Sequence, residues 1–232
     1  MLNRKVAVIT GAPGGLGLAV VKKFRENDAR ICAVSGHEKE IRSAFGADSE
    51  SFLGVEADVT SESAVRKAMD LTVAKFGRID ILIHLVGGFG MSSVEETPLE
   101  EIDKMYKINF LSCFLCCKHA LPGMKKNNWG RIITIGAKGA LSGAGGMAAY
   151  TASKAAVLNL TQALAEEGKK SFITANCLLP SIIDTPANRS SMPASDFSSW
   201  VAPETLAATM LFLCSEEGRN TTGAAIPVFG RV

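Results

Sequence analysis

Short apolar runs alternate along the chain with longer stretches in which apolar residues recur at helical spacing. The short runs, rich in β-branched residues, predict strands, and the longer amphipathic stretches predict helices. The predicted strands are Val6–Thr10, Arg30–Ser35, Phe52–Ala57, Ile79–Leu85, Arg131–Ile135, Ile173–Leu179 and Ala225–Phe229. The predicted helices are Gly15–Asn27, Glu38–Phe45, Ser61–Phe76, Pro98 to about His119, about Ala148 to Glu167, and Pro203–Cys214. Ser61 can cap the third helix, and Gly77 can end it.

The predicted strands are apolar throughout, and helices separate them along the chain. This pattern is typical of a parallel sheet that helices cover on both faces. Right-handed crossovers would arrange about seven strands into a doubly wound, Rossmann-type α/β sheet. The sequence contains no internal repeat, low-complexity tract or linker, so residues 1–232 are predicted to form a single domain.

Composition and charge agree with this picture. Apolar residues make up 47% of the chain and charged residues 21%, which is ordinary for a globular protein with a substantial core. The formal charge of +2 does not indicate nucleic acid or an anionic membrane as a partner. No apolar run reaches the roughly 20 residues that a membrane span needs. The N-terminus does not have the features of a signal peptide, so we expect a cytoplasmic protein.

The cysteines are expected to be buried thiols. They are Cys32, Cys113, Cys116, Cys117, Cys177 and Cys214, and five of them lie in apolar segments, which is consistent with a reducing compartment. Cys113, Cys116, Cys117 and His119 cluster closely enough to suggest a metal site. However, they lie on one apolar helical stretch, and no second ligand pair has metal-site spacing, so no metal is predicted.

A glycine-rich segment connects the first predicted strand to the first predicted helix. It reads Thr10-Gly11-Ala12-Pro13-Gly14-Gly15-Leu16-Gly17. A dinucleotide pyrophosphate needs a tight turn, a closely approachable backbone and a helix N-terminus with free N–H groups. Side chains at Gly11, Gly15 or Gly17 would crowd the turn, the phosphates or the helix packing. The position of this segment favours nucleotide binding over a simple loop.

The end of the second strand bears on the choice between NAD and NADP. An acidic residue there would bind the adenosine ribose and favour NAD, but this position holds Ser35, followed by His37, with Glu38 displaced. A 2′-phosphate would not be repelled, and His37 or Lys39 could approach it. The glycine segment itself contains no Arg or Lys. The sequence therefore predicts only a mild preference for NADP(H).

Tyr150 and Lys154 form the candidate catalytic pair. Residues four apart lie on one face of a helix, so the Lys154 ammonium can approach the Tyr150 phenol. A nearby positive charge would lower the tyrosine pKa from its ordinary value near 10 and make the phenol a usable acid or base. The same lysine could bind a ribose. Tyr150 follows the fifth strand, and its helix begins at the carboxyl edge of the predicted sheet, where such folds bind ligands.

These segments together resemble the short-chain dehydrogenase/reductase family over nearly the whole chain. The matching segments are Thr10–Gly17, Asp58-Val59, Lys107–Phe110, Tyr150 with Lys154, and Leu179–Thr185. The resemblance implies that Leu16 and Gly87 join the cofactor site, that Asp58 and Val59 contact adenine, and that Ile183 and Thr185 contact the nicotinamide. It also implies that Asn109 supports a proton-relay water.

The chain departs from the family pattern at two places. The usual Asn-Asn-Ala-Gly after the fourth strand is His84-Leu85-Val86-Gly87 here. Ala137 occupies the position of the catalytic serine, thirteen residues before Tyr150, and Ser142 is not expected to replace that serine. We expect His84 to be a packed histidine, although a ribose or adenine contact is an alternative, and His119 to lie on a helix surface.

An alanine at the serine position resembles the dihydropteridine reductase branch of the family. Further similarity to that branch lies in Gly87–Gly90, Gly136–Leu141 and Asp184–Trp200. The resemblance implies a short substrate lid around residues 182–200 and hydride transfer to a conjugated, pterin-like small molecule, with Tyr150 as proton donor. Phe89 and Trp200 could flank such a ring, or they could simply pack within the lid.

Two other functions are consistent with the same residues. The chain could be a ketone or 3-oxoacyl reductase in which a water or another side chain replaces the serine at Ala137. It could also be a cofactor-binding homologue with weakened catalysis, although the retention of Tyr150, Lys154 and Asn109 argues against this. The resemblance further implies a homodimer or homotetramer formed through the helix from Pro98 to His119 and the helix of Tyr150.

Overall fold

The computed structural model describes residues 1–232 and contains one fully parallel seven-stranded sheet with the order β3-β2-β1-β4-β5-β6-β7. The strands are β1 (Val6–Thr10), β2 (Arg30–Ser35), β3 (Phe52–Glu56), β4 (Ile81–His84), β5 (Gly130–Ile135), β6 (Ile173–Pro180) and β7 (Ala225–Val228). Their order and direction confirm the predicted doubly wound α/β sheet.

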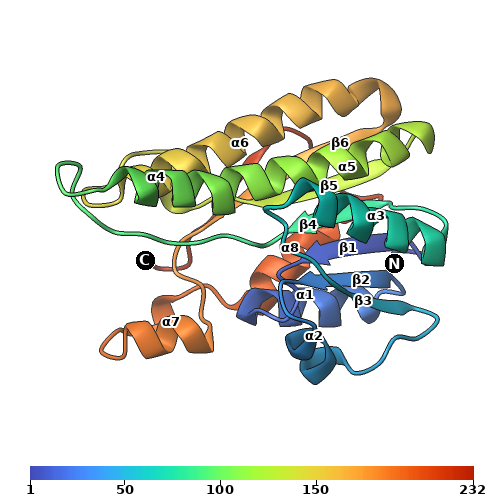
Figure 1. The fold of residues 1–232 in the computed structure, drawn as a ribbon, viewed down its shortest axis with the longest axis horizontal. Coiled ribbons are helices and arrows are strands. Elements are labelled where there is room, and N and C mark those ends of the chain that lie inside the picture. The colour runs from blue at the N-terminus through green and yellow to red at the C-terminus, as the bar shows by residue number, and fades with distance from the viewer.

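Helices cover both faces of the sheet (Figure 1). They are α1 (Gly15–Arg25), α2 (Glu38–Phe45), α3 (Glu62–Phe76), α4 (Leu99–Met105), α5 (Ser112–Lys126), α6 (Ala148–Gly168), α7 (Pro186–Ser191) and α8 (Pro203–Cys214). Alternate strand residues point to opposite faces, so the sheet separates two apolar cores. Val8 and Leu82 pack towards α3, α5 and α6, whereas Ile9 and Ile83 pack towards α1 and α8.

The predicted helix from Pro98 to His119 differs most from the structure. The observed helical segment runs on to Lys126 and is interrupted by a π-helical turn at Tyr106–Leu111 between α4 and α5. A π turn replaces i→i+4 bonds with i→i+5 bonds within one turn, and the apolar spacing of the sequence, which predicts one continuous helix, does not mark this local change. Such turns are frequent at functional sites, and this one contains Asn109.

The ends of α3 agree with the sequence in part. Gly77 ends the helix in a left-handed conformation with φ of 83°, as predicted. Ser61 occupies the N-cap position, but its hydroxyl is within 3.2 Å of the Ser63 hydroxyl and caps no backbone amide. The sequence thus predicts the N-cap position correctly, but the predicted capping hydrogen bond from the Ser61 side chain is absent.

The strand order reverses between β1 and β4, which are neighbours in the sheet: β2 and β3 are added on one side of β1, and β5, β6 and β7 are added on the other side of β4. Helices on opposite faces follow these two strands, so a crevice opens at their carboxyl ends, where α/β folds bind ligands. The long loop before α4 and the segment containing α7 project from this same end of the sheet (Figure 1). None of the helices combines the length and the apolar character needed to cross a membrane.

Candidate active site

The glycine segment lies at the carboxyl end of β1, and its three predicted glycines are required for different reasons. Gly11 has a φ of 66°, which a residue with a side chain rarely adopts. A Cβ at Gly15 would lie 2.8 Å from Thr185, and one at Gly17 would lie 2.4 Å from the carbonyl oxygen of Ala12. The glycines thus permit a tight turn at Gly11, close contact between Gly15 and the loop after β6, and close contact between Gly17 and the turn itself.

The N-terminus of α1 is suited to an anion. The backbone N–H groups of Gly15, Leu16 and Gly17 have no backbone acceptor, and no side chain caps the helix. The first turn also contains no acidic residue that would compete for the positive end of the helix dipole. These free donors fit a pyrophosphate, as the sequence predicts.

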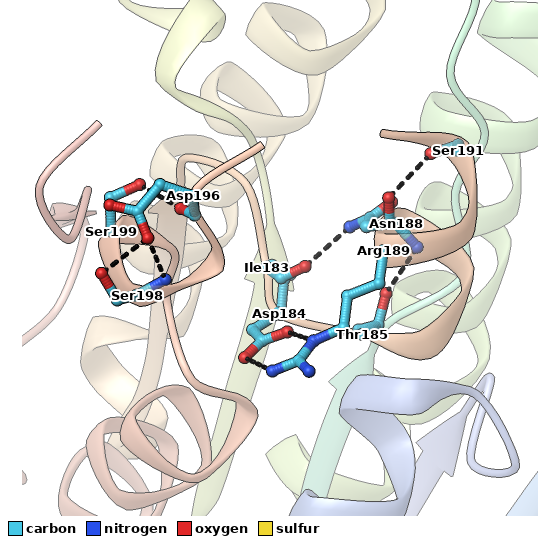
Figure 2. Close-up of polar contacts among 9 residues, drawn as sticks. All are labelled: Ile183, Asp184, Thr185, Asn188, Arg189, Ser191, Asp196, Ser198 and Ser199. Atoms are coloured by element: carbon cyan, nitrogen blue, oxygen red, sulfur yellow. Dashed lines mark hydrogen bonds and ion pairs between the residues drawn. The ribbon is translucent and has the colours of Figure 1, made fainter. Parts of the chain in front are cut away.

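Thr185 connects the predicted lid to the glycine segment. Its Oγ1 accepts a hydrogen bond from the Asn188 amide at 3.3 Å and so caps α7, while its Cβ packs over Gly15. Figure 2 shows the contacts around it: Asn188 Nδ2 donates to the Ile183 carbonyl at 2.8 Å, and Arg189 binds both carboxylate oxygens of Asp184. These contacts hold Ile183 and Thr185 in place beside the glycine segment.

The adenosine end of the site contains a carboxylate that the sequence did not reveal. Ser35, at the end of β2, donates a hydrogen bond from Oγ to Glu40 Oε2 at 2.9 Å. Glu40 belongs to α2, and the turn at His37 brings it back over the strand end. The family pattern places the acid at the end of the strand, where Ser35 stands here. A short polar residue with an acid five positions later is the sequence signal that could have identified it.

Asp58 and Val59 lie after β3, two strands from the switch point. Asp58 accepts hydrogen bonds from the amide and the hydroxyl of Thr60, and these bonds hold the pKa of its carboxyl below the usual value. Asp58 is exposed and Val59 is buried. The pair could present an ionised carboxylate and an apolar surface to an adenine.

Tyr150 and Lys154 lie on the first turns of α6, as predicted. Lys154 is buried, and its ammonium donates to the carbonyl oxygen of Ile135 at the end of β5 at 3.0 Å. A Cβ at Gly87 would lie 2.9 Å from Lys154 Nζ and 2.7 Å from Asn109 Oδ1. The absence of a side chain at Gly87 thus brings the lysine, the asparagine and the loop after β4 together.

The electrostatics of the pair correct one prediction. Burial raises the pKa of the Tyr150 phenol above its usual value, and the Lys154 charge does not offset this effect. Burial also lowers the pKa of Lys154 to about 8. The expected lowering of the tyrosine pKa is therefore wrong for the protein without ligand, because the ammonium is held at Ile135 in a desolvated position. Tyr150 is therefore a neutral phenol at pH 7 and has a proton that it can donate.

Asn109 is held rigidly within the π turn. Its Nδ2 donates to the Gly88 carbonyl at 3.1 Å and to Ser153 Oγ at 3.0 Å, while its Oδ1 accepts from the Gly88 amide. Ser153 in turn donates to the Tyr150 carbonyl at 2.7 Å. Both amide hydrogens are occupied, so a relay water could use only the remaining lone pair of Oδ1 or a backbone group. Ser153 lies between Tyr150 and Lys154 in sequence, and no sequence motif indicated that it would connect Asn109 to the first turn of α6.

The substrate side is apolar and aromatic. Ala137 is buried in an extended conformation, and no hydroxyl replaces the absent serine; Ser142 is exposed. Phe89 is 61% exposed and packs edge-on against Tyr150, with ring centroids 5.0 Å apart. Trp200 is buried against Phe197 at 4.8 Å, which agrees with packing within the lid. Of the two proposed aromatic residues, only Phe89 therefore presents an exposed ring.

The histidines and cysteines that the sequence singles out pack within the fold. His84 is buried between Thr10 and Ser112, as expected for a packed histidine, and His119 on α5 lies 3.1 Å from Glu62. All six cysteines are buried and unpaired, and no group of three or more potential ligands could hold a metal ion. Burial raises the pKa of Cys32 to about 12, so this thiol stays protonated.

The free amides of α1, the Gly87 approach and the buried Lys154 ammonium together form a cradle from β1 to β5 that fits a dinucleotide. Thr185 and Lys154 are the residues that would hold the nicotinamide end of such a ligand. The arrangement is therefore suited to bringing a hydride donor against a substrate next to a phenol.

Comparisons with known proteins agree with this arrangement. The family description "short chain dehydrogenase" matches residues 5–196. A 2-(R)-hydroxypropyl-CoM dehydrogenase from Xanthobacter autotrophicus is 31% identical over 97% of each chain, and a D-beta-hydroxybutyrate dehydrogenase from Rhizobium meliloti is 28% identical over 97% of each. A 3-ketoacyl-(acyl-carrier-protein) reductase from Brucella melitensis, solved with NADH, superposes with a TM-score of 0.89 and 30% identity, covering 100% of this chain and 99% of its own. The structure of ElxO with NADP has a TM-score of 0.90 and 29% identity, with 98% coverage of both chains.

Proposed function

The chain belongs to the short-chain dehydrogenase family and is an NAD(P)-dependent oxidoreductase; from this premise, we propose that it reduces a planar, conjugated acceptor such as a quinonoid dihydropterin. The observation that carries this proposal is the neutral, buried phenol of Tyr150 beside Phe89, with Ala137 where a hydroxyl would bind a substrate oxygen. This site has a proton donor and an aromatic surface but only a weak means of polarising a simple carbonyl.

The bound nicotinamide supplies the hydride. The residues of this chain orient the reactants and provide the proton. Tyr150 donates its phenolic proton to the acceptor atom that gains negative charge. Lys154 does not lower the resting pKa of the phenol while its ammonium is held at the Ile135 carbonyl. We propose that the ammonium turns towards the Tyr150 oxygen as negative charge develops there and so stabilises the state that follows proton transfer. Asn109 and Ser153 fix the first turn of α6 and thereby the direction of the phenol.

The acceptor class follows from the missing hydroxyl. In a simple ketone, negative charge develops on one oxygen, and losing one hydrogen-bond donor to that oxygen costs several kcal/mol of transition-state stabilisation, about 3 in a well-studied case from another enzyme class. In a conjugated quinonoid or imine ring, the charge is delocalised over several atoms. An aromatic side chain such as Phe89 can also hold a planar ring by stacking or edge contacts.

Turnover of acceptors by the wild type and by Tyr150→Phe tests this function. We expect the wild type to oxidise NAD(P)H with quinonoid dihydropterin, and Tyr150→Phe to lower kcat by roughly 100-fold or more. Tyr106→Phe, which changes the other tyrosine of the chain, should retain activity. Unchanged turnover in Tyr150→Phe would contradict the mechanism, and failure with the pterin together with turnover of ketones would contradict the acceptor class.

A second candidate function is the reduction of ketones or 3-oxoacyl groups. The named relatives favour it, because they include a D-beta-hydroxybutyrate dehydrogenase and a 3-ketoacyl-(acyl-carrier-protein) reductase. A water bound near Ala137 would then replace the serine hydroxyl. A panel of ketones and 3-oxoacyl thioesters in the same assay separates the two candidates.

The choice of cofactor depends on Glu40. The named structures contain NADP in one case and NADH in another, so they do not test the mild preference for NADP(H) that the sequence predicts. However, the Glu40 carboxylate at Ser35 could accept a hydrogen bond from a ribose 2′-hydroxyl and would repel a 2′-phosphate. The nearby Arg42 is occupied by Glu38 and Asp48. On this basis we propose NADH as the favoured cofactor.

Dissociation constants of NADH and NADPH, measured by fluorescence quenching, test this assignment. We expect Glu40→Gln to improve NADPH binding relative to NADH by about 10-fold, since one like charge is removed from the phosphate position. Glu166→Gln makes the same change of charge at an exposed position on α6 and should leave the ratio unchanged. Tighter binding of NADPH than of NADH by the wild type would overturn the assignment.

A further inference from the structure

His84 lies at the end of β4, at the switch point of the sheet, and is fully enclosed. Its ring bridges two elements that belong to different halves of the site. Nδ1 is 3.0 Å from Thr10 Oγ1, at the start of the glycine segment, and Nε2 is 3.1 Å from Ser112 Oγ, directly after the π turn. Both nitrogens of this buried ring are therefore hydrogen-bonded, each to a different half of the site.

The neighbouring hydrogen bonds fix the direction of each bond. Ser112 Oγ donates to the carbonyl oxygen of Ile108 at 2.6 Å, so it must accept from His84 Nε2–H. Nδ1 is then the acceptor and receives the hydroxyl hydrogen of Thr10, whose oxygen accepts from the Leu85 amide. Burial lowers the pKa of His84 to about 3, so the ring is neutral, with one donor and one acceptor, as this chain of bonds requires.

The π turn is the element that Ser112 joins to this chain. Ile108, whose carbonyl accepts from Ser112, directly precedes Asn109 in the turn. The Asn109 side chain holds Gly88 on one side and Ser153, next to Lys154, on the other. A shift of the turn would therefore move Asn109 relative to both the loop after β4 and the first turn of α6.

We propose that His84 is a positioning residue: it fixes the π turn through Ser112 and thereby sets Asn109, Ser153 and the first turn of α6 for proton donation by Tyr150. The proposal deepens the function proposed above and rests on it. It assigns separate effects to the two ring nitrogens. The bond to Ser112 governs the proton-donating groups, and the bond to Thr10 secures the glycine segment.

Two substitutions separate these effects, because the amide of asparagine reaches about as far as Nδ1 and the amide of glutamine reaches about as far as Nε2. His84→Asn can keep the contact with Thr10 but not the contact with Ser112. His84→Gln can keep the contact with Ser112. Thr134→Val is a matched control, because Thr134 pairs with His84 in register on β5 and is equally buried, but it bonds to Thr161 of α6 instead of the π turn.

We expect His84→Asn to lower kcat by roughly 10- to 100-fold, with the dissociation constant of the cofactor changed by less than about 3-fold. His84→Gln should retain kcat within about 3-fold, and Thr134→Val should retain kcat even if its Tm falls. Equal losses of kcat in the asparagine and glutamine variants, or the same loss in Thr134→Val, would overturn the proposal.

Hydrogen exchange provides a readout that does not depend on the reaction. The amides of residues 108–113 should exchange about 10-fold faster or more in His84→Asn than in His84→Gln, whereas the amides of β1 should stay protected in both. Unchanged exchange at the π turn in His84→Asn would refute the link between His84 and that turn. If the wild type turned over none of the acceptors, the proposed function would fail, and the exchange data would still decide whether His84 holds the turn.

Discussion

At the residue scale, the reactivity of the site depends on where two buried groups are held. Lys154 lies 3.0 Å from the Ile135 carbonyl, and burial lowers its pKa to about 8. Tyr150 stays a phenol because burial raises its pKa. Both shifts have the same cause, the loss of water around a charged form, and they leave a neutral acid and an ammonium one helical turn apart on α6 at pH 7.

The pH dependence of reduction should follow the charge of Lys154. We expect kcat/KM to be constant below pH 8 and to fall as pH rises through the lysine pKa of about 8, because the neutral amine no longer stabilises a phenolate. Initial rates across this range measure the effect. A plateau that extends to the tyrosine pKa would show that Lys154 does not need its charge.

Stability should change in the opposite direction over the same range. The folded pKa of Lys154 lies below its ordinary value of 10.5, so burying the charged form costs stability below pH 8. This cost is relieved as pH rises from about 8 to 10.5. The contribution of Lys154 to Tm should therefore rise while activity falls, which distinguishes the loss of activity from unfolding. Thermal melts of the wild type and Lys154→Met should differ most below pH 8.

Restoring a hydroxyl at Ala137 should change the preferred acceptor. Ala137 has an extended backbone that serine also adopts. We expect Ala137→Ser to raise kcat/KM for simple ketones by about 10-fold or more and to change turnover of the conjugated acceptor much less. Ala140→Ser adds a hydroxyl nearby and is the control. An equal gain for both acceptor classes would contradict the role that we assign to the missing serine.

At the scale of elements, the site is made where loops after different strands touch. Thr185, after β6, packs over Gly15, after β1, while Gly87, after β4, approaches Asn109 and Lys154. Gly15 and Gly87 are therefore needed where loops come into close contact, whereas Gly11 is needed for its positive φ. The π turn between α4 and α5 serves the same end, because it holds Asn109 against Gly88.

A methyl group at Gly87 should disrupt the catalytic residues. The Cβ would lie 2.7 Å from Asn109 Oδ1 and 2.9 Å from Lys154 Nζ, so at least one of them must move. We expect Gly87→Ala to lower kcat by roughly 100-fold. Gly123→Ala, where a Cβ would meet nothing within 4 Å, should keep full activity. Steady-state kinetics of the two variants decide this, and normal kcat in Gly87→Ala would refute the close approach.

At the scale of the whole molecule, exposed apolar side chains lie along one helical segment. Ile102, Tyr106, Leu111 and Phe114, on α4, the π turn and α5, are each between 37% and 40% exposed. We propose that this segment forms the interface of a homodimer or homotetramer, as the family resemblance implies. This segment covers one face of the sheet together with α6 (Figure 1).

Light scattering tests this assembly. We expect Phe114→Glu to lower the oligomeric mass, because a charge would be buried against the partner. Leu71→Glu places the same charge at a similarly exposed apolar position on α3 and should leave the mass unchanged. Identical masses for wild type and Phe114→Glu would place the interface elsewhere.

Local patterns in the sequence were sufficient for the fold and for much of the site. Apolar strands between amphipathic helices require a covered parallel sheet, and a glycine segment after the first strand marks its ligand-binding edge. Tyr150 and Lys154 share a helix face because they are four residues apart. Gly77 ends α3 as expected, since a left-handed residue is needed there.

Other features depend on residues that are distant in sequence and became visible only in three dimensions. The Glu40 carboxylate reaches Ser35 because α2 folds back over β2, and His84 joins Thr10 to Ser112 because β1 and β4 are neighbours. The pKa values of Tyr150 and Lys154 follow burial, which depends on the packing of the whole domain. The sequence by itself thus determined the elements and the candidate catalytic pair, whereas tertiary packing decided the charge states and partners of that pair. The reason is that desolvation and contacts across the sheet are set only when distant segments meet.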